Sequence, residues 1–372
     1  MPVYVASALP RLMQCGASKV MPGFTPPGII EQTDDQREGD AAHWLATEFL
    51  TGRTTDLYEW IDRKAPNGVY ISDDMVDSVE YYIAQLSSRP ERRFVEQDFS
   101  FQFGELTIHS RPDMVSDSLA DYGRRIYIDD FKYGWKIVEP DMNWTLIAYA
   151  ICFIASRRID ADTVFEFRIH QPRPWHPIGK SRSWIVSAAR LHDLRNQMIN
   201  HLLTVTDTLV TGDHCFKCPA RSNCPALRKS TMEVLDVVER AIPDQMTADD
   251  LSFMYDALTI GEHRLSDYKS AIKERIEHAI KTGQPVRNYR MKSTNGKLDW
   301  VDGLDMVSIL RLLAPDKVTA KPPKPITPTQ AKKIIPEDMV MQFAERGPGG
   351  VQLVRSDTNQ QATALAQGII GE

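Results

Sequence analysis

Residues 124–134 read RRIYIDDFKYG, an alternation of apolar and charged side chains that indicates a β-strand entering a hydrophobic core. Successive side chains of a strand point to opposite faces, so every second residue shares a face. One face carries Ile126, Ile128, Asp130 and Lys132. Because the two isoleucines would enter the core, the carboxylate and the ammonium group lie at its rim, where charges need a partner or a metal ion. The stretch therefore predicts a core strand and a candidate ionic site.

A second carboxylate lies upstream, where residues 111–115 read RPDMV. If residues 114–124 form a loop between neighbouring strands, Asp113 comes beside Asp130. Two adjacent carboxylates repel each other unless a cation lies between them. Phosphodiester hydrolysis uses such a site, because Mg²⁺ or Mn²⁺ activates water and neutralises developing charge, often as a pair of ions roughly 4 Å apart. Lys132 would then orient the attacking water or help to deprotonate it.

The alternative for this motif is a surface ion pair between Asp130 and Lys132 at the end of a strand. A D-x-K pattern occurs often by chance, so the spacing alone does not separate the two interpretations.

The pattern along the chain predicts a mixed α/β core. Four segments have helical periodicity: 37–51, 73–87, 141–156 and 187–210. Residues 92–132 alternate between turn signals and β-enriched runs, which predicts an antiparallel meander. The run TVFEFRIHQPR, residues 163–173, predicts a further strand ended by prolines.

The chain changes character near residue 230, which predicts one domain over 1–230 and a C-terminal extension over 231–372. The extension begins with a charged helical stretch at about 232–283. A short segment of strand character follows at 288–302, and a proline-rich linker, KPPKPITPTQ, occupies 321–330.

Composition excludes several classes of protein. The formal charge of −6 argues against a protein that coats nucleic acid non-specifically, since such binding neutralises many phosphates with Lys and Arg. No apolar run is long enough for a transmembrane helix, and the first residues lack the pattern of a signal peptide, so we expect a cytoplasmic protein with no membrane partner. No GxxxxGK[ST] motif is present, which argues against an ATP-driven motor in this chain.

Five cysteines in a cytoplasmic chain are better interpreted as metal ligands or buried thiols than as disulfides. Cys215, Cys218 and Cys224 form a C-x2-C-x5-C cluster whose thiolates can converge on one centre. Cys15, followed by Gly16, is the candidate for a fourth ligand. Cys152, within an apolar helix, is expected to be an inert buried thiol. Spacing does not distinguish zinc from an iron–sulfur cluster.

Several motifs, in order along the chain, resemble the RecB-like branch of the PD-(D/E)XK nucleases, and more closely a phage- and prophage-borne family within it. The matching stretches are EGDAAHWLATEFL (38–50), FVEQDF (94–99), RPDMV (111–115), IDDFKYG (128–134), NWTLIAYA (143–150), FRIHQPR (167–173) and GDHCFKCPARSNCPA (212–226). The likeness runs from Cys15 to about residue 360, and IDDFKYG and the cysteine cluster are its specific parts.

The resemblance implies a restriction-endonuclease-like core, in which a central mixed sheet is flanked by helices, followed by a C-terminal helical extension. It also implies a metal-dependent deoxyribonuclease, most simply an exonuclease. It implies DNA with a free end or single strand as substrate, and a phage recombination or replication protein as a possible partner in the host cytoplasm. Asp113 and Asp130 would be the principal metal ligands, His43 a further ligand or site-shaping residue, and Lys132 the catalytic lysine. Glu96 would be an auxiliary acid.

The resemblance also implies that Tyr149 contacts DNA or phosphate. Each of these residues has a structural alternative: a boundary histidine for His43, a solvated strand residue for Glu96, and core packing for Tyr149. The family usually carries Gln four residues before that tyrosine, whereas this chain has Thr145, which is shorter; Asn143 is the candidate to replace the glutamine.

The cysteine arrangement resembles the [4Fe–4S] staple of helicase-nuclease subunits and CRISPR-associated nucleases, which ties the ends of the nuclease domain together. Cys15, Cys215, Cys218 and Cys224 would be the ligands, and zinc is the alternative metal.

Two functions of other classes remain open: a non-catalytic DNA-binding or assembly protein that keeps the nuclease fold, and a zinc-stapled protein-interaction domain. A loop motif, QPRPWHP at 171–177, also has two interpretations. Arg173, Trp175 and His176 could stack on a base and contact phosphate, or the loop could be a rigid turn with a packed tryptophan, which is the expected form.

Overall fold

The computed structural model describes residues 2–355 except 22, 24–33, 87–91, 121–122, 158, 205, 241–245, 294–297, 302–303, 305, 314–327, 333–334 and 347–350. The chain divides into two compact units, Met1–Lys269 and Ser270–Glu372. This division falls inside one continuous helix, α7 (Ala248–Lys281). The domain boundary that the sequence indicates near residue 230 stays a prediction.

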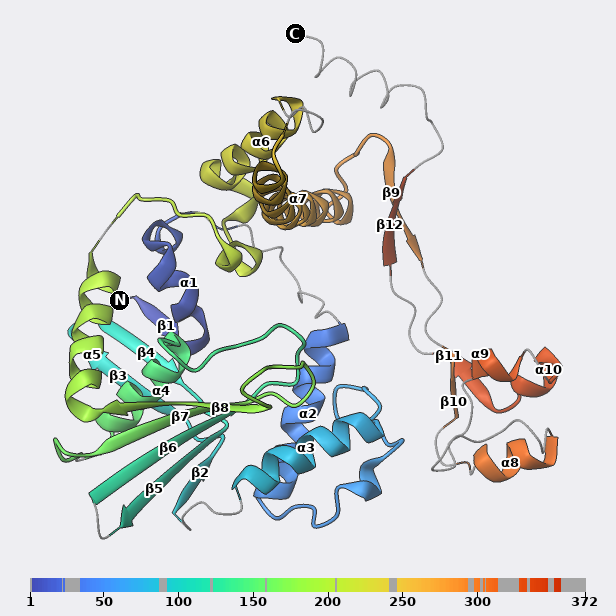
Figure 1. The fold of residues 1–372 in the computed structure, drawn as a ribbon. Helices are drawn as coiled ribbons and strands as arrows, with labels where there is room; N and C mark the ends of the chain where they lie inside the picture. Colours follow the sequence, from blue (N-terminus) through green and yellow to red (C-terminus); the bar gives the residue numbers. More distant parts are fainter. Residues whose placement is uncertain are drawn as a thin grey trace. The chain divides into compact units, whose positions relative to one another are not determined.

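The first unit contains a five-stranded mixed sheet in the order β2-β5-β6-β7-β8 (Figure 1). Its strands are β2 (Arg93–Val95), β5 (Met114–Ala120), β6 (Gly123–Phe131), β7 (Val164–His170) and β8 (Ser181–Ser187). β6 and β7 are parallel, and the other neighbours are antiparallel. A parallel pair needs a crossover, which helix α4 (Trp144–Ala155) provides. The predicted central mixed sheet flanked by helices is confirmed.

A separate three-stranded sheet corrects the prediction of one meander over residues 92–132. β3 (Phe99–Phe103) and β4 (Leu106–Ser110) form a hairpin, and β1 (Val3–Val5) pairs with β4 in parallel. Pro112, which has no N–H, stands between β4 and β5. Alternation predicts strands correctly here, but it does not say which strand belongs to which sheet.

Helices cover the five-stranded sheet with two separate hydrophobic cores (Figure 1). The larger core joins α1 (Leu9–Gln14), α4 and α5 (Ala188–Leu203) to strand residues that include Ile126 and Ile128. The second core joins α2 (Asp34–Leu50) and α3 (Asp73–Leu86) to Phe131. The predicted alternation along β6 is therefore confirmed, since its isoleucines and its phenylalanine enter different cores.

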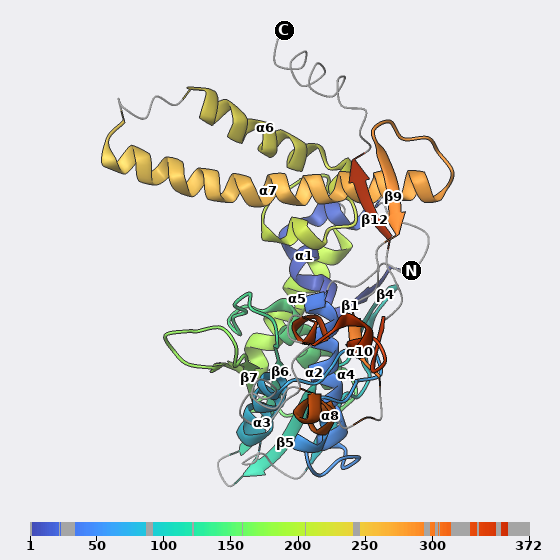
Figure 2. The ribbon, with the colours of Figure 1, turned by 90° about the vertical axis from the view of Figure 1, so that its right-hand side faces the viewer.

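The remaining elements of the first unit are short turns of helix and one long helical pair. The 3₁₀ turns are η1 (Ala6–Ala8), η2 (Gly16–Lys19), η3 (Tyr58–Trp60), η4 (Asp213–Lys217) and η5 (Arg221–Asn223). α6 (Pro225–Arg240) lies along α7 (Figure 2). A Cβ on Gly261 would come within 2.4 Å of Val234 Cγ1, so glycine is needed for this close approach. Strand β8 was not predicted.

Besides the end of α7, the described residues of the second unit form two small antiparallel pairs and three short helices. β9 (Tyr289–Ser293) pairs with β12 (Val351–Arg355), and β10 (Leu298–Trp300) pairs with β11 (Ala344–Arg346). The helices are α8 (Met306–Leu313), α9 (Pro328–Ala331) and α10 (Glu337–Val340). The strand character predicted for residues 288–302 is confirmed in β9 and β10. Residues 321–327 of the predicted proline-rich linker lie outside the described residues.

Within the part of the chain that the structure describes, no helix combines the length and the apolar character needed to span a bilayer.

Candidate functional site

The pairing of β5 with β6 brings the two predicted carboxylates together at one end of the sheet. Met114 is opposite Asp129, so Asp113, one residue earlier, lies beside Asp130. Asp113 Oδ2 accepts a 2.6 Å hydrogen bond from the backbone N–H of Phe131, which ties this carboxylate to the neighbouring strand. The expected proximity of the two carboxylates is thus found, although the connection between them is a tight strand pair rather than a long loop.

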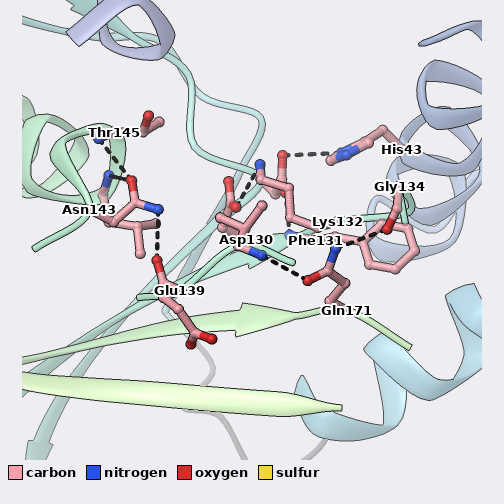
Figure 3. Close-up of polar contacts among 12 residues, drawn as sticks. His43, Asp130, Phe131, Lys132, Gly134, Glu139, Asn143, Thr145 and Gln171 are labelled. Atoms are coloured by element: carbon pink, nitrogen blue, oxygen red, sulfur yellow. Dashed lines mark hydrogen bonds and ion pairs between the residues drawn. The ribbon is translucent and has the colours of Figure 1, made fainter. Parts of the chain in front are cut away.

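Lys132 holds one oxygen of Asp130 and leaves the other without a partner (Figure 3). The Lys132 Nζ lies 2.6 Å from Asp130 Oδ2. Asp130 is only 2 % exposed, and its buried Oδ1 has no hydrogen-bond partner among the described residues. A buried carboxylate oxygen without a partner is costly, which makes this atom a candidate ligand atom.

His43 reaches the same place from the middle of α2 (Figure 3). Its Nδ1 lies 3.2 Å from Asp113 Oδ1, and its ring packs against Phe131. His43, Glu96 and Asp113 each present a ligand atom within 4.8 Å of the others, and no further set of this kind occurs among the described residues. Imidazole nitrogen and carboxylate oxygen together suit a divalent ion such as Mn²⁺.

Glu96 follows β2 with φ of 47°, in the left-handed region that a glutamate rarely occupies. Its N–H donates to Asp113 O at 3.1 Å, which holds this conformation. A residue held there costs of order 1 kcal/mol and persists where the surroundings require it, often at functional sites. Burial and the Asp113 carboxylate raise the pKa of Glu96 to about 7. Glu96 is therefore part of the carboxylate cluster and not a solvated strand residue.

The other charges of the cluster respond to the excess of carboxylates. Burial raises the pKa of Asp130, although Lys132 opposes this. Burial alone would lower the pKa of Lys132, but the Asp130 and Asp113 carboxylates raise it above its usual value. Burial would also raise the pKa of Asp113, but His43 holds it below its usual value. The lysine is thus kept charged, and acidic groups outnumber basic groups.

Tyr149 lies on α4 and is buried in the larger core. Burial, followed by Asp130 and Asp113, raises the pKa of its hydroxyl. The tyrosine therefore packs in the core, as the structural alternative has it, and its hydroxyl is influenced by the carboxylates; its contact with DNA or phosphate stays a prediction.

The structure gives Asn143 a different task from the one suggested for it. Its Oδ1 accepts hydrogen bonds from the N–H groups of Thr145 and Leu146, at 3.0 and 3.5 Å, and caps α4 (Figure 3). Its Nδ2 donates to Glu139 O at 3.0 Å. With both ends of the amide engaged, Asn143 does not replace the glutamine of the family.

The four predicted cysteine ligands line one cavity, some distance along the chain from one another. Cys15 ends α1, Cys215 lies in η4, and Cys218 and Cys224 flank η5. Burial raises the pKa of Cys215 and Cys218, and the neighbouring cysteines add to this effect. Cys152 does not line this cavity. It is fully buried in α4, and its thiol donates a hydrogen bond to Ile108 O, as expected for an inert thiol.

Gln171 is an organising residue that the sequence did not reveal. Its buried amide donates to Gly134 O and Lys136 O at 2.9 and 2.8 Å and accepts from Val138 N–H at 3.1 Å (Figure 3). It fastens the segment after Lys132 to the end of β7. No local pattern signals this role, since the partners are backbone atoms more than thirty residues away in the chain.

Comparisons with solved structures find only slight overall likeness. One match is a crystal structure from Eubacterium rectale described as a "Putative exonuclease", with 12% identity, a TM-score of 0.31, and coverage of 66% of this chain and 91% of that chain. Another is the protein SSO0001, with 10% identity, a TM-score of 0.24, and coverage of 54% and 89%. At these scores the similarity carries no functional argument.

No curated protein matches the chain. A family profile does match, over residues 5–361, which is nearly the whole length. The match includes the carboxylate cluster, the cysteine cavity and most of the second unit. The chain therefore belongs to the DUF2800 family, which is described as a protein of unknown function.

Proposed function

We propose that this chain is a Mg²⁺- or Mn²⁺-dependent deoxyribonuclease of the PD-(D/E)XK type, RecB-like branch. The observation that carries the proposal is the buried, unpartnered Oδ1 of Asp130, flanked by Asp113 and the charged Lys132. An excess of buried carboxylates beside one lysine is relieved by a proton or a cation, and a divalent cation there matches the need of phosphodiester hydrolysis.

The donor set fits a hard divalent ion. Asp113 and Asp130 would be the principal ligands. The ligand atoms of Asp113, His43 and Glu96 lie within 4.8 Å of one another, and Asp130 lies beside Asp113 on the neighbouring strand. Such an ion, when bound, supplies Lewis-acid activation of a water and neutralises charge on the phosphate. The raised pKa of Glu96 fits this assignment, because its proton would leave when a cation takes its place.

The protein's own residues then prepare the reaction. Lys132, held 2.6 Å from Asp130, presents an ammonium group that donates to the attacking water or to a phosphate oxygen. Asp113 is fixed by the Phe131 N–H, so the distance between the carboxylates does not depend on side-chain freedom. Tyr149 closes the cluster on the α4 side and limits access of bulk water.

The resemblance of the motifs supports a finer proposal, namely an exonuclease that acts on DNA ends or single strands during phage recombination or replication. A phage recombination or replication protein would be its partner.

A cleavage assay tests the nuclease proposal. Labelled single- and double-stranded DNA is incubated with Mg²⁺, Mn²⁺ or EDTA, and wild type is compared with Asp130→Ala, Lys132→Ala and the control Asp141→Asn, an exposed carboxylate on the following loop. We expect metal-dependent cleavage by wild type and the control only. Wild type that binds DNA without cleaving it would favour the non-catalytic DNA-binding protein. Wild type without DNA affinity would favour the protein-interaction domain.

We further propose a [4Fe–4S] cluster held by Cys15, Cys215, Cys218 and Cys224. The four cysteines line one cavity, and the resemblance to the [4Fe–4S] staple favours this cluster over zinc. The cluster would link Cys15 to cysteines about 200 positions later and stabilise the whole domain.

Anaerobic purification followed by absorption spectroscopy and iron assay tests the cluster. Cys218→Ser should lose iron and lower the unfolding temperature, whereas Cys152→Ser, a buried thiol outside the cavity, should keep its iron. Stoichiometric zinc without iron in wild type would overturn the iron–sulfur assignment.

A further inference from the structure

Two tryptophans stand exposed on the segments that leave the carboxylate end of the sheet. Trp135 follows Lys132 by three residues and is 60% exposed. Trp175 lies on the loop between β7 and β8 and is 81% exposed, so the expected packed tryptophan is wrong. Large aromatic rings in water next to a candidate active site indicate a binding surface.

Arg173 adds a positioned cation to this surface. Its guanidinium carbon lies 4.3 Å from the ring centre of Tyr133 and 4.4 Å from that of Trp135. Its Nη1 donates to Tyr133 O at 3.3 Å and pairs with Glu38 at 3.4 Å. Stacking on the rings restricts the guanidinium, so less freedom is lost when it meets an anion.

Hydrogen bonds and an ion pair join the two segments that carry these residues. Gln171 joins Gly134, Lys136 and Val138 to the end of β7 (Figure 3). Arg182 Nη2 donates to Val138 O at 2.7 Å, and His176 pairs with Glu139 at 2.9 Å. The Trp135 segment is therefore fixed relative to Lys132, because Lys132 N–H also donates to His170 O at 2.8 Å in the same strand pair.

We propose that Trp135, Trp175 and Arg173 form a stacking platform for the unpaired bases of single-stranded DNA that enters the carboxylate cluster. The proposal specifies single-stranded DNA as the substrate class of the nuclease proposed above, and it rests on that function. Bases in a duplex are already stacked on each other, whereas unpaired bases offer free ring faces to tryptophan. Arg173 is placed to meet the adjoining phosphates.

The platform is tested by fluorescence anisotropy with labelled oligothymidylate and, separately, a blunt duplex, both in EDTA so that no cleavage occurs. Wild type is compared with Trp135→Ala, Trp175→Ala and the pair. Phe253→Ala, which removes a 78% exposed ring from α7, is the matched control. Trp175→Phe keeps a ring face and should restore most of the affinity. Circular dichroism confirms that each variant is folded.

We expect each tryptophan-to-alanine change to weaken oligothymidylate binding by roughly 5- to 100-fold, with little change for the duplex and none for Phe253→Ala. Unchanged oligothymidylate affinity would overturn the platform, as would an equal loss for both DNAs. No oligothymidylate binding by wild type would also overturn it and would favour a protein partner on this surface. Tryptophan-dependent binding without metal-dependent cleavage would support the platform and reject the nuclease, so the two failures are distinguishable.

Discussion

The buried carboxylates at the two ends of the five-stranded sheet differ in how fully basic partners neutralise them. At one end, Asp117 receives two hydrogen bonds from Arg124, at 2.9 and 2.7 Å, and Glu166 pairs with Arg125 and Arg168. At the other end, Asp130 has a single lysine and an oxygen without a partner. Both ends belong to the same strands, β5, β6 and β7.

The difference separates structural charge from functional charge. Arginine pairs neutralise the acids at the first end, as expected where ions only support the fold. At the second end a deficit of positive charge is tolerated, which is unfavourable for the free protein and favourable for a cation-binding site. The position of the excess negative charge, and not the number of ion pairs, indicates the site.

The largest expected effect comes from Asp130→Asn, which keeps the shape of the side chain and removes its charge. We expect cleavage in Mg²⁺ or Mn²⁺ to fall by at least about 10²- to 10³-fold, since a group that stabilises charge at the reacting centre is lost. Loss of the Lys132 ion pair is offset by relief of the repulsion with Asp113, so the unfolding temperature should change little. Cleavage assays and differential scanning calorimetry measure the two effects. A destabilised variant of unchanged activity would reverse the assignment of the two ends.

The next effect concerns stabilisation by the metal. Because an ion binds only the folded site, Mn²⁺ at about 100 times its dissociation constant should stabilise wild type by ~2.7 kcal/mol. Asp113→Asn should lose most of this gain, whereas Asp117→Asn should retain it. Thermal unfolding across a Mn²⁺ titration provides the measurement, and equal gains in all three proteins would argue against a site at Asp113.

Asp117→Asn should have a smaller effect, on stability alone. The change leaves Arg124 without its charged partner, and partial exposure of this arginine limits the loss to about 1–3 kcal/mol. Metal-dependent cleavage should stay within about twofold of wild type. Urea unfolding and the cleavage assay check the prediction, which a large loss of activity in a folded protein would contradict.

The smallest effect is in the pH dependence of stability. The hydrogen bonds from Arg124 hold the pKa of Asp117 below its usual value. A lowered folded-state pKa stabilises the protein above the unfolded-state pKa of about 3.9, and the contribution is lost as pH falls through the folded-state value. Asp117→Asn should therefore lose less stability than wild type on acidification below about pH 4, as urea unfolding at several pH values would reveal. Parallel pH profiles would exclude this contribution.

Much of the fold followed from local patterns, because those patterns report which side chains are buried. The period of two in RRIYIDDFKYG predicted the face shared by Asp130 and Lys132, and the apolar run at 144–155 predicted α4. Sheet membership was not predictable in this way. The parallel pairing of Val3–Val5 with β4 joins segments about a hundred residues apart, and no periodicity in either segment encodes that contact.

The candidate site was likewise only partly predictable from local patterns. The strand pattern placed Asp113 near Asp130, whereas His43 on α2 was assigned only through resemblance to a nuclease family, since an amphipathic helix does not show which end of a sheet it meets. β8 was missed because SRSWIVS follows a proline-rich loop and directly precedes a helix, so its short alternation merged with the helical pattern. The exposed Trp175 was also unexpected, as burial of a ring is the commoner outcome.

The bond between Asp113 Oδ2 and the N–H of Phe131 has a consequence for how the chain tolerates mutation. Its donor is an atom that nineteen of the twenty amino acids share, so at position 131 only proline would remove it. Neighbouring side chains could therefore diverge among related proteins while the aspartate keeps its orientation. Replacing Phe131 with proline would remove this hydrogen bond, which no other single substitution at that position can remove.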